Sequence, residues 1–449
     1  MSKRKLSFLA AGLIVAVLGI AGIVLASTGV VGKIIRTPEG RVDTLKPPPP
    51  PKRITIAAVG DIMMGTDYPA PRLPSQNGAL LFKDAAPILR AVDIAFGNLE
   101  GPITCSQGCT KVMGSGKTFA FRCPPSLAWN LQDAGFDVMG LANNHSMDFG
   151  GQGYWETKKI LDSLGIKHSG KEGDVAGFVV DDTKIGVIAF AVGGPPRSIL
   201  NIDQCREEVS KLSSEYDILV VSFHGGTEGT NALHTKNEQE NLYGEPRGNV
   251  IQFAHAMIDA GADVIIGHGP HVPRGMEIYK DRIIAYSLGN FCTYACMQLV
   301  AELGYAPLLV VEVDSIGRFQ QGEVHSFLQI PPGGPSKDTT EKAFKLMRDM
   351  SLSDFPATAP SFAKSLKFYS APSDSTLTKE QLQTILDSLN KIEIVKPDTI
   401  KPASAAPLSI ISDTEISKDS NIKTVPVEMN KEPAAETDSL KNEAISDTN

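Results

Sequence analysis

The sequence predicts an α/β protein, and three observations support this fold class. Apolar segments with the character of buried strands alternate with amphipathic segments that have the character of helices. Glycine or a polar turn closes most of the apolar segments, as expected where strands lead into loops. The bulk composition, 42% apolar and 21% charged, is that of a globular protein. Together these observations predict sheets with helices packed on them.

The start of the chain predicts a membrane anchor. The cationic "MSKRK" precedes a stretch without charge from Leu6 to Gly32, and more than about 18 apolar residues can span a bilayer. We expect residues 1–33 to be a single-pass helix in the cell membrane, with the rest of the chain extracytoplasmic. The alternative is a cleaved signal peptide, because "VLA" at Val24–Ala26 could serve as a cleavage site.

Four further regions follow the expected anchor. Residues 34–53 contain "KPPPPPKR" and predict a stiff, extended stalk. Residues 54–331 hold the alternating pattern and form the expected folded domain. Residues 332–394 contain two amphipathic segments, "TTEKAFKLMRDMS" and "TKEQLQTILDSLNKI", and predict a short helical extension. Residues 395–449 are rich in Ser, Thr, Pro and Glu with few aromatics, so we expect a disordered tail.

Within 54–331 the order of elements can be assigned from the pattern. Six strands are expected after the first one, "ITIAAVGDIMMG": "VDIAFGNLE", "FDVMGLANN", "KIGVIAFAV", "YDILVVSFHGG", "ADVIIGHGP" and "RIIAYSLGNF". Three of the helices expected between them each close on glycine: "PPSLAWNLQDAG", "YWETKKILDSLG" and "NVIQFAHAMIDAG".

Net charge and cysteine spacing exclude some classes of function. The formal net charge of −8 argues against a nucleic-acid partner, since phosphate binding needs a basic face. The six cysteines include two C-x3-C spacings, which match neither a zinc finger nor a redox C-x2-C motif. Outside the cytoplasm close pairs can oxidise, so we expect local disulfides in preference to a metal site. The pairing is not deducible.

Polar side chains recur at the carboxyl ends of the expected strands. Ligands of α/β proteins gather at that edge, and carboxylates and imidazoles together suit divalent ions. One such residue alone is a weak signal. A single Asp after a strand is often a turn or helix cap, and a single His there often makes only a hydrogen bond within the loop. Recurrence at successive strand ends favours a shared site. Its candidates are Asp61, Asn98, Glu100, Asn143, Asn144, His145, Asp148, His224, Glu228, His268, His271 and Asn290.

Six motifs occur in an order that resembles a known family. They are "GDIMMG", "NLEGPI", "LANNHSMDFG", "SFHGGTE", "GADVIIGHGPHVPRGMEIY" and "IAYSLGNF". The chain is similar over residues 54–330 to the CapA-type family of bacterial capsule synthesis proteins, whose polymer is poly-γ-glutamate. That family resembles the calcineurin-like metallophosphoesterases. The resemblance implies a four-layer α/β/β/α sandwich of two mixed sheets flanked by helices.

The metallophosphoesterase signature is matched in part. In its first motif, Asp-x-His, Asp61 fits but Met63 stands where the histidine belongs. Glu100 is the nearest candidate for the bridging aspartate of the second motif. In the third, Gly-Asn-His-Asp, Asn144 and His145 fit.

The later motifs also match with shifts. Asp148 follows the third motif and is the candidate to replace its missing orienting aspartate. His224 fits the fourth motif. In the last, Gly-His-x-His, His268 fits and the second histidine arrives one residue late, at His271.

The resemblance implies roles for these residues. His145 is expected to be the general acid, with Asp148 orienting it. Arg274 and Asn290 are expected to contact an anionic substrate, although a salt bridge is the alternative for Arg274. One or two divalent ions, Mn, Zn or Fe, are expected, and Met63 makes a single ion the alternative. The expected metal ligands are Asp61, Glu100, Asn144, His224, His268 and His271.

Two other catalytic or binding motifs are excluded by the sequence. "GSGKT" at Gly114–Thr118 lacks the first glycine of a phosphate-binding loop, because that position is Lys111. No serine lies in a G-x-S-x-G elbow, so a serine hydrolase is not expected.

Three functions stay open from sequence. The first is a metal-dependent hydrolase or transferase that acts on an anionic capsule polymer, beside other membrane-bound capsule synthesis components. The second is a non-catalytic scaffold that binds the polymer during assembly and export. The third is a metal-dependent phosphoesterase that acts on another envelope substrate, since fold resemblance alone does not choose a substrate.

Overall fold

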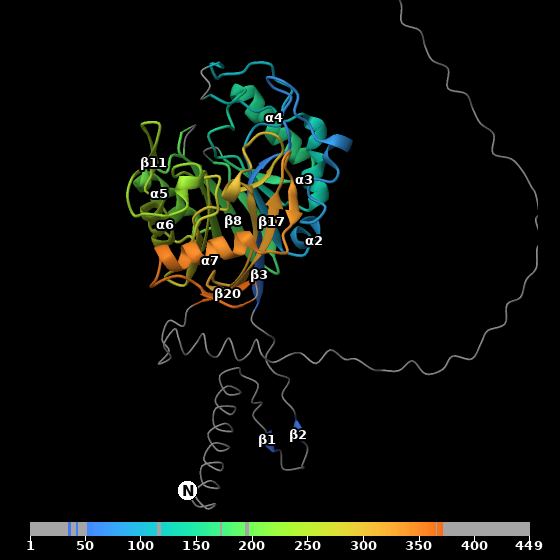
Figure 1. The fold of residues 1–449 in the computed structure, drawn as a ribbon. Helices are drawn as coiled ribbons and strands as arrows, with labels where there is room; N and C mark the ends of the chain where they lie inside the picture. Colours follow the sequence, from blue (N-terminus) through green and yellow to red (C-terminus); the bar gives the residue numbers. More distant parts are fainter. Residues whose placement is uncertain are drawn as a thin grey trace, which may run out of the picture. The chain divides into compact units, whose positions relative to one another are not determined.

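Two β-sheets lie face to face, and helices cover the outer surface of each (Figure 1). The computed structural model describes residues 52–114, 118–170, 173–193, 197–364 and 366–370, with the backbone of a two-residue strand pair, β1 (Ile35–Arg36) and β2 (Val42–Asp43). The expected anchor, most of the stalk, the second expected helix of the extension and the tail lie outside the described residues. Within them, no helix is long and apolar enough to cross a membrane.

The larger sheet has ten strands in the described part of the chain. Its order is β19-β20-β17-β16-β3-β4-β5-β6, with β15 paired to β3 and β18 paired to β17. Strands β3 to β6 run parallel, whereas β16 and β17 run antiparallel to their neighbours. The strands are β3 (Arg53–Met63), β4 (Ile94–Leu99), β5 (Val138–Gly140), β6 (Lys167–Ser169), β15 (Asn290–Thr293), β16 (Tyr305–Asp314), β17 (Phe319–Gln329), β18 (Pro335–Lys337), β19 (Ser361–Phe362) and β20 (Lys367–Tyr369).

The smaller sheet has the order β13-β14-β12-β9-β8-β7. Its four inner strands run parallel, and the two outer strands close it in antiparallel pairs. A hairpin of β10 (Glu240–Leu242) and β11 (Glu245–Gly248) stands apart from both sheets. The strands of the smaller sheet are β7 (Ala176–Val180), β8 (Thr183–Ala191), β9 (Ile218–His224), β12 (Val264–His268), β13 (Met276–Tyr279) and β14 (Arg282–Ala285).

Three apolar clusters define the layers. One fills the space between the sheets and contains Ile56 of the larger sheet and Val220 of the smaller sheet. A second joins the outer face of the larger sheet to α3 and α4 through Leu131 and Leu161. The third joins the smaller sheet to α5 and α6, with Phe253 at its centre. Because the inner strands are buried on both faces, they are mainly apolar until their carboxyl ends. The α/β class predicted from the sequence is confirmed.

The helices begin and end where local chemistry favours it. The side chain of Asn249 accepts a hydrogen bond from the amide of Gln252 and caps α6. Gly135 ends α3 with a φ of 94°, which a side chain would disfavour. The helices are α2 (Ala86–Leu89), α3 (Trp129–Ala134), α4 (Gly150–Ser163), α5 (Ile202–Leu212), α6 (Val250–Asp259) and α7 (Lys342–Asp354), with single 3₁₀ turns η1 (Ser75–Gly78), η2 (Pro125–Leu127), η3 (Thr230–Ala232) and η4 (Ala301–Gly304).

The chain continues the same fold beyond Pro331, where sequence analysis placed the end of the domain. The first expected helix of the extension is present as α7, whose Phe344 and Met347 pack into the cluster between the sheets. Strands β18 and β20 add to β17 at the edge of the larger sheet. Strands of two or three residues carry too few positions to show a period of two, so the sequence did not reveal them.

All six cysteines lie in the described residues, and none forms a disulfide. The prediction of local disulfides is therefore wrong for this structure. Cys123 and Cys292 are buried in the apolar cluster under α3 and α4. Burial raises the pKa of both thiols above the ordinary range, which keeps them protonated and unreactive.

Candidate metal centre

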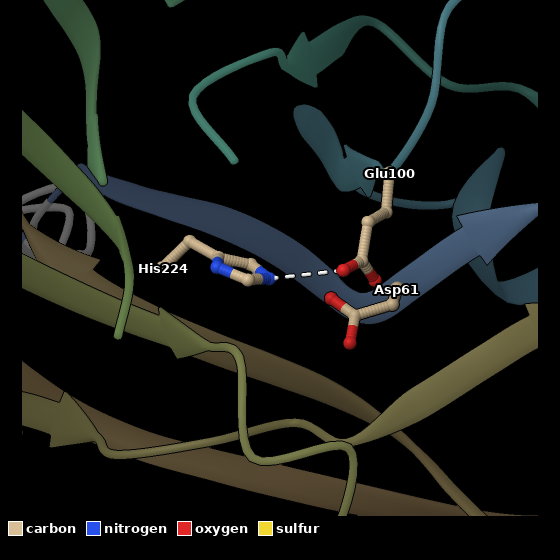
Figure 2. Close-up of side chains that lie close together, drawn as sticks. All are labelled: Asp61, Glu100 and His224. Carbon is tan, nitrogen blue, oxygen red and sulfur yellow. Dashed lines mark hydrogen bonds and ion pairs between the residues drawn. The ribbon is translucent and has the colours of Figure 1, made fainter. Parts of the chain in front are cut away.

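The carboxyl ends of parallel strands from both sheets meet at one buried polar centre. Asp61 lies near the end of β3 and Glu100 follows β4, both in the larger sheet, while His224 ends β9 of the smaller sheet. All three side chains are fully buried. They lie close together, with the His224 ring facing the Glu100 carboxyl group (Figure 2). One ligand atom from each lies within 4.8 Å of the other two. The fold thus brings three residues that are far apart in the sequence to a single point.

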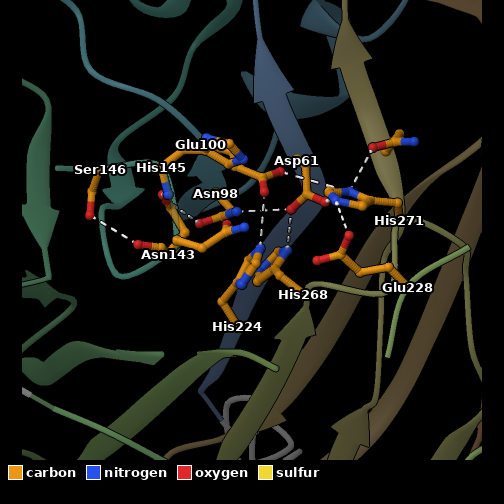
Figure 3. Close-up of polar contacts among 12 residues, drawn as sticks. Asp61, Asn98, Glu100, Asn143, His145, Ser146, His224, Glu228, His268 and His271 are labelled. Atoms are coloured by element: carbon orange, nitrogen blue, oxygen red, sulfur yellow. Dashed lines mark hydrogen bonds and ion pairs between the residues drawn. The ribbon is translucent and has the colours of Figure 1, made fainter. Parts of the chain in front are cut away.

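Asp61 is bound on both of its oxygens. Its Oδ1 accepts a hydrogen bond of 2.8 Å from the Asn98 amide and lies 3.5 Å from His268 Nδ1. Its Oδ2 lies 2.9 Å from His271 Nδ1 (Figure 3). Burial alone would raise the pKa of Asp61, but the two imidazoles outweigh burial and hold that pKa well below its ordinary range. Asp61 is therefore a permanent anion at the centre.

Glu100 is the second buried carboxyl group. Its Oε1 lies 3.2 Å from His224 Nε2, and its Oε2 lies 3.8 Å from His271 Nδ1. Burial, with the Asp61 charge second, raises the pKa of Glu100 well above its ordinary range. The carboxyl groups of Asp61 and Glu100 each have an oxygen within 4.8 Å of the other. They repel each other when both are ionised, so a nearby positive charge is needed to hold them both as anions.

The two histidines that face these carboxyl groups differ in charge. Burial lowers the pKa of His224 well below its ordinary range, so His224 is neutral. For His271, burial acts in the same direction, but the charges of Glu100 and Asp61 outweigh it and raise the pKa to about 10. His271 also has a φ of 60°, which is uncommon for a residue with a side chain and fixes the ring against Asp61.

Several polar atoms of this centre are buried without a hydrogen-bond partner among the described residues. Buried polar groups in proteins are nearly always satisfied, so a cluster of unsatisfied atoms points to a ligand. Every one of these atoms is an oxygen or an imidazole nitrogen, the donor types that borderline divalent ions prefer. The residues present therefore fit a divalent ion. The atoms are Glu100 Oε2, His224 Nδ1, His268 Nδ1 and His268 Nε2, and Asn144 Oδ1 in the loop after β5 is likewise buried without a partner.

The loop after β5 supplies a second polar unit beside the centre. His145 Nδ1 lies 2.9 Å from Asp148 Oδ2, as expected for an orienting carboxylate. This leaves His145 Nε2 as the nitrogen that can exchange a proton. Burial lowers the pKa of His145, and its contact with Asp148 opposes that shift. Asn143 shapes the turn, because its Oδ1 accepts from the His145 amide.

Sequence analysis missed Lys111, which binds this unit from the loop between β4 and α3. Its Nζ lies 2.6 Å from Asp148 Oδ1 and 3.0 Å from His145 Nδ1. It also donates to the carbonyl oxygens of Asn144 and Phe119. The loop has no regular secondary structure, so nothing in the sequence pattern marked its lysine. Asn98, which donates to Asp61, lies near the end of β4 and was marked in the sequence by the same rule that marked Glu100.

Arg274 does not serve the role predicted for it. Its side chain is fully buried, and its guanidinium binds the Glu240 carboxylate at 2.7 Å and 2.8 Å. Its Nε also donates to the carbonyl oxygen of Ala232. With its charge neutralised by Glu240 and its side chain without exposed surface, Arg274 is not placed to contact a substrate. The salt bridge that sequence analysis left as the alternative is present, and it lies inside the protein.

Asn290 was also expected to contact substrate, and it lies within the centre. It is fully buried, its Oδ1 lies 3.1 Å from His271 Nδ1, and its Nδ2 donates to the carbonyl oxygen of Leu303. Glu228 lies on the other side of His271, with Oε2 3.9 Å from Nε2, and is held by Arg247. These contacts place Asn290 among the candidate ligands. Glu228 lies next to the ring of His271, on the side of Nε2.

The fold and the centre define a class of protein: a mixed α/β protein with a buried group of carboxylates and imidazoles where its parallel strands end. The family described as "Bacterial capsule synthesis protein PGA_cap" matches residues 55–295, more than half of the chain. The chain belongs to this family, which confirms the resemblance seen in the sequence.

Two relatives in this family are similar over about half of the chain. The "PGA biosynthesis protein CapA" of Bacillus subtilis (strain 168) is 32% identical over 256 residues, which are 53% of this chain and 63% of the relative. The "Capsule biosynthesis protein CapA" of Bacillus anthracis is 30% identical over 263 residues, 54% of this chain and 60% of the relative. The chain thus spans about three fifths of the length of these curated relatives.

Among solved structures, a hypothetical protein from Thermus thermophilus matches with a TM-score of 0.38 and 16% sequence identity. The match covers 61% of this chain and 99% of that protein.

Proposed function

We propose that this chain is a membrane-anchored, extracytoplasmic protein of capsule polymer synthesis or export that carries a divalent-metal, hydrolase-like site. The observation that carries the proposal is the group of buried, unsatisfied ligand atoms around Asp61 and Glu100. Membership of the capsule synthesis family supports a role in capsule synthesis. The relatives' names favour poly-γ-glutamate as the polymer. We assign the fold to the calcineurin-like metallophosphoesterases, as the four layers and the strand-end ligands favour.

The ion would be held by atoms from both sheets. Its ligands would be Asp61, Glu100 and His224, with His268 and His271 in contact with the two carboxylates. Asn144, whose Oδ1 is buried without a partner among the described residues, stays a further candidate ligand. When bound, such an ion polarises a substrate oxygen and lowers the pKa of a water molecule towards about 7.

The chain's own residues supply the remaining chemistry. His145 exchanges a proton with the leaving group through Nε2, because Asp148 holds Nδ1. Lys111 pairs with the other oxygen of the Asp148 carboxylate. Phe121 packs its ring against that of His145, with 4.7 Å between centroids, and restricts its rotation. Proton transfer therefore takes place from a ring held in one orientation.

The cations near the centre are already paired. Arg274 binds Glu240, Arg247 binds Glu228 and Lys111 binds Asp148. An anionic polymer thus finds no unpaired guanidinium or ammonium group among these three contacts. A divalent ion at the centre would add positive charge to bind it.

One observation favours the scaffold as a second candidate. Asp61, Glu100 and His224 have no exposed surface, which leaves little access for a polymer chain. In that case the ion would stabilise the fold, and the polymer would bind elsewhere on the protein.

Metal analysis of the purified full-length chain tests the proposal. We expect Mn, Zn or Fe in stoichiometric amount in the wild type and its loss in His224→Ala. His234→Ala is the matched control, since His234 is exposed and pairs with Asp354 away from the centre. A folded wild type without bound metal after incubation with these ions would refute the metal site. Capsule yield in cells that carry the same variants then separates the two candidates, because a scaffold tolerates the loss of catalysis.

A further inference from the structure

A surface groove lies between the loop after β3 and the turn that joins β17 to β18. Its first cavity, of about 160 Å³, is lined by Pro74 and Leu80 from the loop, Pro335 from the turn, and Tyr294 just after β15. A second cavity of about 190 Å³ lies along α2. Lys83 lines both cavities, so they form one continuous groove.

The wall formed by the β17–β18 turn is held in place by backbone contacts. The Tyr294 amide donates to the carbonyl oxygen of Met63 at 2.9 Å. Oε1 of Gln329 accepts from the Gly334 amide at 3.3 Å. A Cβ at Gly333 would lie only 3.0 Å from the Cα of Tyr294, so the turn packs directly on this tyrosine. A groove formed in advance binds a flexible ligand at a lower entropic cost.

The surface of the groove is largely apolar. Leu80 is 58% exposed, and Leu73, which precedes the lining residue Pro74, is 42% exposed. Tyr294 is half-buried between them and the β17–β18 turn. Large apolar side chains that stay exposed beside a cavity mark a binding surface. The groove can therefore hold aliphatic groups of a ligand.

Three exposed cations surround this apolar surface: Arg72, Lys83 and Lys337. None of the three forms an ion pair in the described part of the chain. Lys337 follows the lining residue Ser336, and its amide donates to the Asp84 carboxylate at 3.3 Å. Asp84 is thus an acid at this end of the groove, beside two cations.

Arg72 stands beside the segment that follows β15. Burial raises the pKa of the Cys296 thiol to about 12, and the nearby charge of Arg72 opposes that shift. The second cavity adds Arg90, which lies 3.4 Å from an exposed carboxylate of Asp133, and exposed pairs of this kind are weak. The whole chain has a formal net charge of −8. A local group of cations on an acidic protein favours an anion that the rest of the surface repels.

Strand β15 connects the groove with the buried centre. Asn290, the first residue of β15, lies 3.1 Å from His271 in the centre, and Tyr294 follows the last residue of the strand. Four residues of extended chain span about 13 Å. A polymer bound in the groove therefore lies within a few monomer units of the centre.

We propose that this groove binds the capsule polymer as a flexible polyanion whose carboxylates are carried on short aliphatic stems. The stems would lie on the apolar surface, and the carboxylates would face the three unpaired cations. An inorganic polyanion offers the charge without the stems, whereas a purely apolar ligand leaves the cations without partners. The inference rests on the proposed function, since it names the surface that binds the polymer of that function.

Binding of a fluorescent γ-linked glutamate oligomer to the full-length chain tests the inference, with EDTA present so that no metal ion contributes. Fluorescence anisotropy gives the Kd. An exposed charge contact contributes roughly a factor of three to affinity, so Arg72→Gln/Lys83→Gln should bind roughly tenfold more weakly. Lys159→Gln/Lys184→Gln is the matched control, because both lysines are exposed and the change in net charge is the same. Its affinity should equal that of the wild type.

Polyphosphate is the second probe, because it carries charge without aliphatic stems. Leu80→Asn should weaken binding of the glutamate oligomer roughly threefold and leave binding of polyphosphate unchanged. Leu80 is largely exposed, so its substitution should affect folding little.

Several results would overturn the groove as the polymer site. They are no binding of the oligomer by the wild type, equal affinity of the wild type and Arg72→Gln/Lys83→Gln, or an equal loss in the lysine control. Unchanged binding of the oligomer by Leu80→Asn would also overturn it, because any polyanion would then suffice. A wild-type dimer that Leu80→Asn converts to a monomer would assign the groove to a second copy of the chain. The metal analysis stands apart: a wild type without metal refutes the metal site and leaves these binding results unaffected.

Discussion

Asp61 and Asn290 are direct partners across two parallel strands, and both side chains contact the same nitrogen of His271. Strand β16 pairs with β3 from Arg53 to Val59, and β15 takes over at Asp61. The change of partner occurs at Gly60. The geometry of the candidate centre therefore depends on a backbone contact between β3 and β15.

Gly60→Ala should destabilise the protein by about 3 kcal/mol, because its Cβ would overlap two carbonyl oxygens of residues 288 and 289 that cannot rotate away. Urea unfolding measures this change. Metal affinity should fall in the same variant, since β15 carries Asn290. Gly151→Ala is the matched control: Gly151 lies in the first turn of α4 with no atom near its Cβ position. That control should be neutral or more stable by up to about 1 kcal/mol. Equal stability of the two variants would contradict the close approach.

Removal of the metal should lower the stability of the wild type. A ligand at 100 times its dissociation constant stabilises the folded state by about 2.7 kcal/mol, so a chelator should lower the Tm by roughly 5 °C. Scanning calorimetry with and without EDTA measures the shift. Glu100→Gln should show a much smaller shift, because it removes a shared ligand of the centre. A shift of the same size in both proteins would mean that the chelator acts at another place.

Asp148 should matter more for stability than Lys111. Asp148 Oδ2 accepts from the Phe121 amide and faces His145 Nδ1, while its Oδ1 pairs with Lys111. Asp148→Ala leaves several buried groups unpaired and should cost about 3 kcal/mol. Lys111→Met removes one partner of a carboxylate that keeps two others, and should cost about 1 kcal/mol. Urea unfolding gives both values.

Lys159→Met is the control for loss of a lysine, because Lys159 is exposed on α4 and packs on Trp155. It should change stability by less than about 0.5 kcal/mol. If Lys111→Met costs as much as Asp148→Ala, the lysine and not the aspartate holds the loop against the candidate site.

The sequence predicted the parts of this centre that follow a local rule. Asp61, Glu100 and His224 each follow or end an apolar strand, and such strand ends meet at one edge of a parallel sheet. Proximity in the fold could be inferred without knowing the register. The α/β class followed from the alternation of elements in the same way.

The parts that sequence reasoning missed depend on contacts between distant segments. Lys111 binds Asp148 from an irregular loop, and no period marks a residue there. Arg274 is neutralised by Glu240, which lies on a hairpin of very short strands. The pairing of Asn290 with Asp61 follows from the backbone contact described above. Each of these requires the register of two segments far apart in the chain, and hydrophobic pattern alone does not specify that register.

Glu277 should make a pH-dependent contribution to stability away from the metal centre. Its side chain is buried and accepts from Tyr286 and Thr358, at 2.7 Å and 2.9 Å, and faces His255 Nε2 at 2.9 Å. Burial alone would raise the pKa of Glu277, but the contacts with His255, Tyr286 and Thr358 outweigh it and lower that pKa below its ordinary 4.5. The folded state therefore binds its proton less tightly than the unfolded state does.

The sign of the pH dependence follows from the lower pKa of Glu277 in the folded state. The stabilisation is fully present above pH 4.5 and is lost as the pH falls through the lower, folded-state pKa. Glu277→Gln should cost about 1–2 kcal/mol at pH 7, and its difference from the wild type should shrink below about pH 4. Urea unfolding at several pH values measures this difference. Glu238→Gln, at an exposed position, should show a small difference at every pH. A Glu277→Gln difference that stays constant down to about pH 3 would mean that the folded state does not lower the pKa of this carboxyl group.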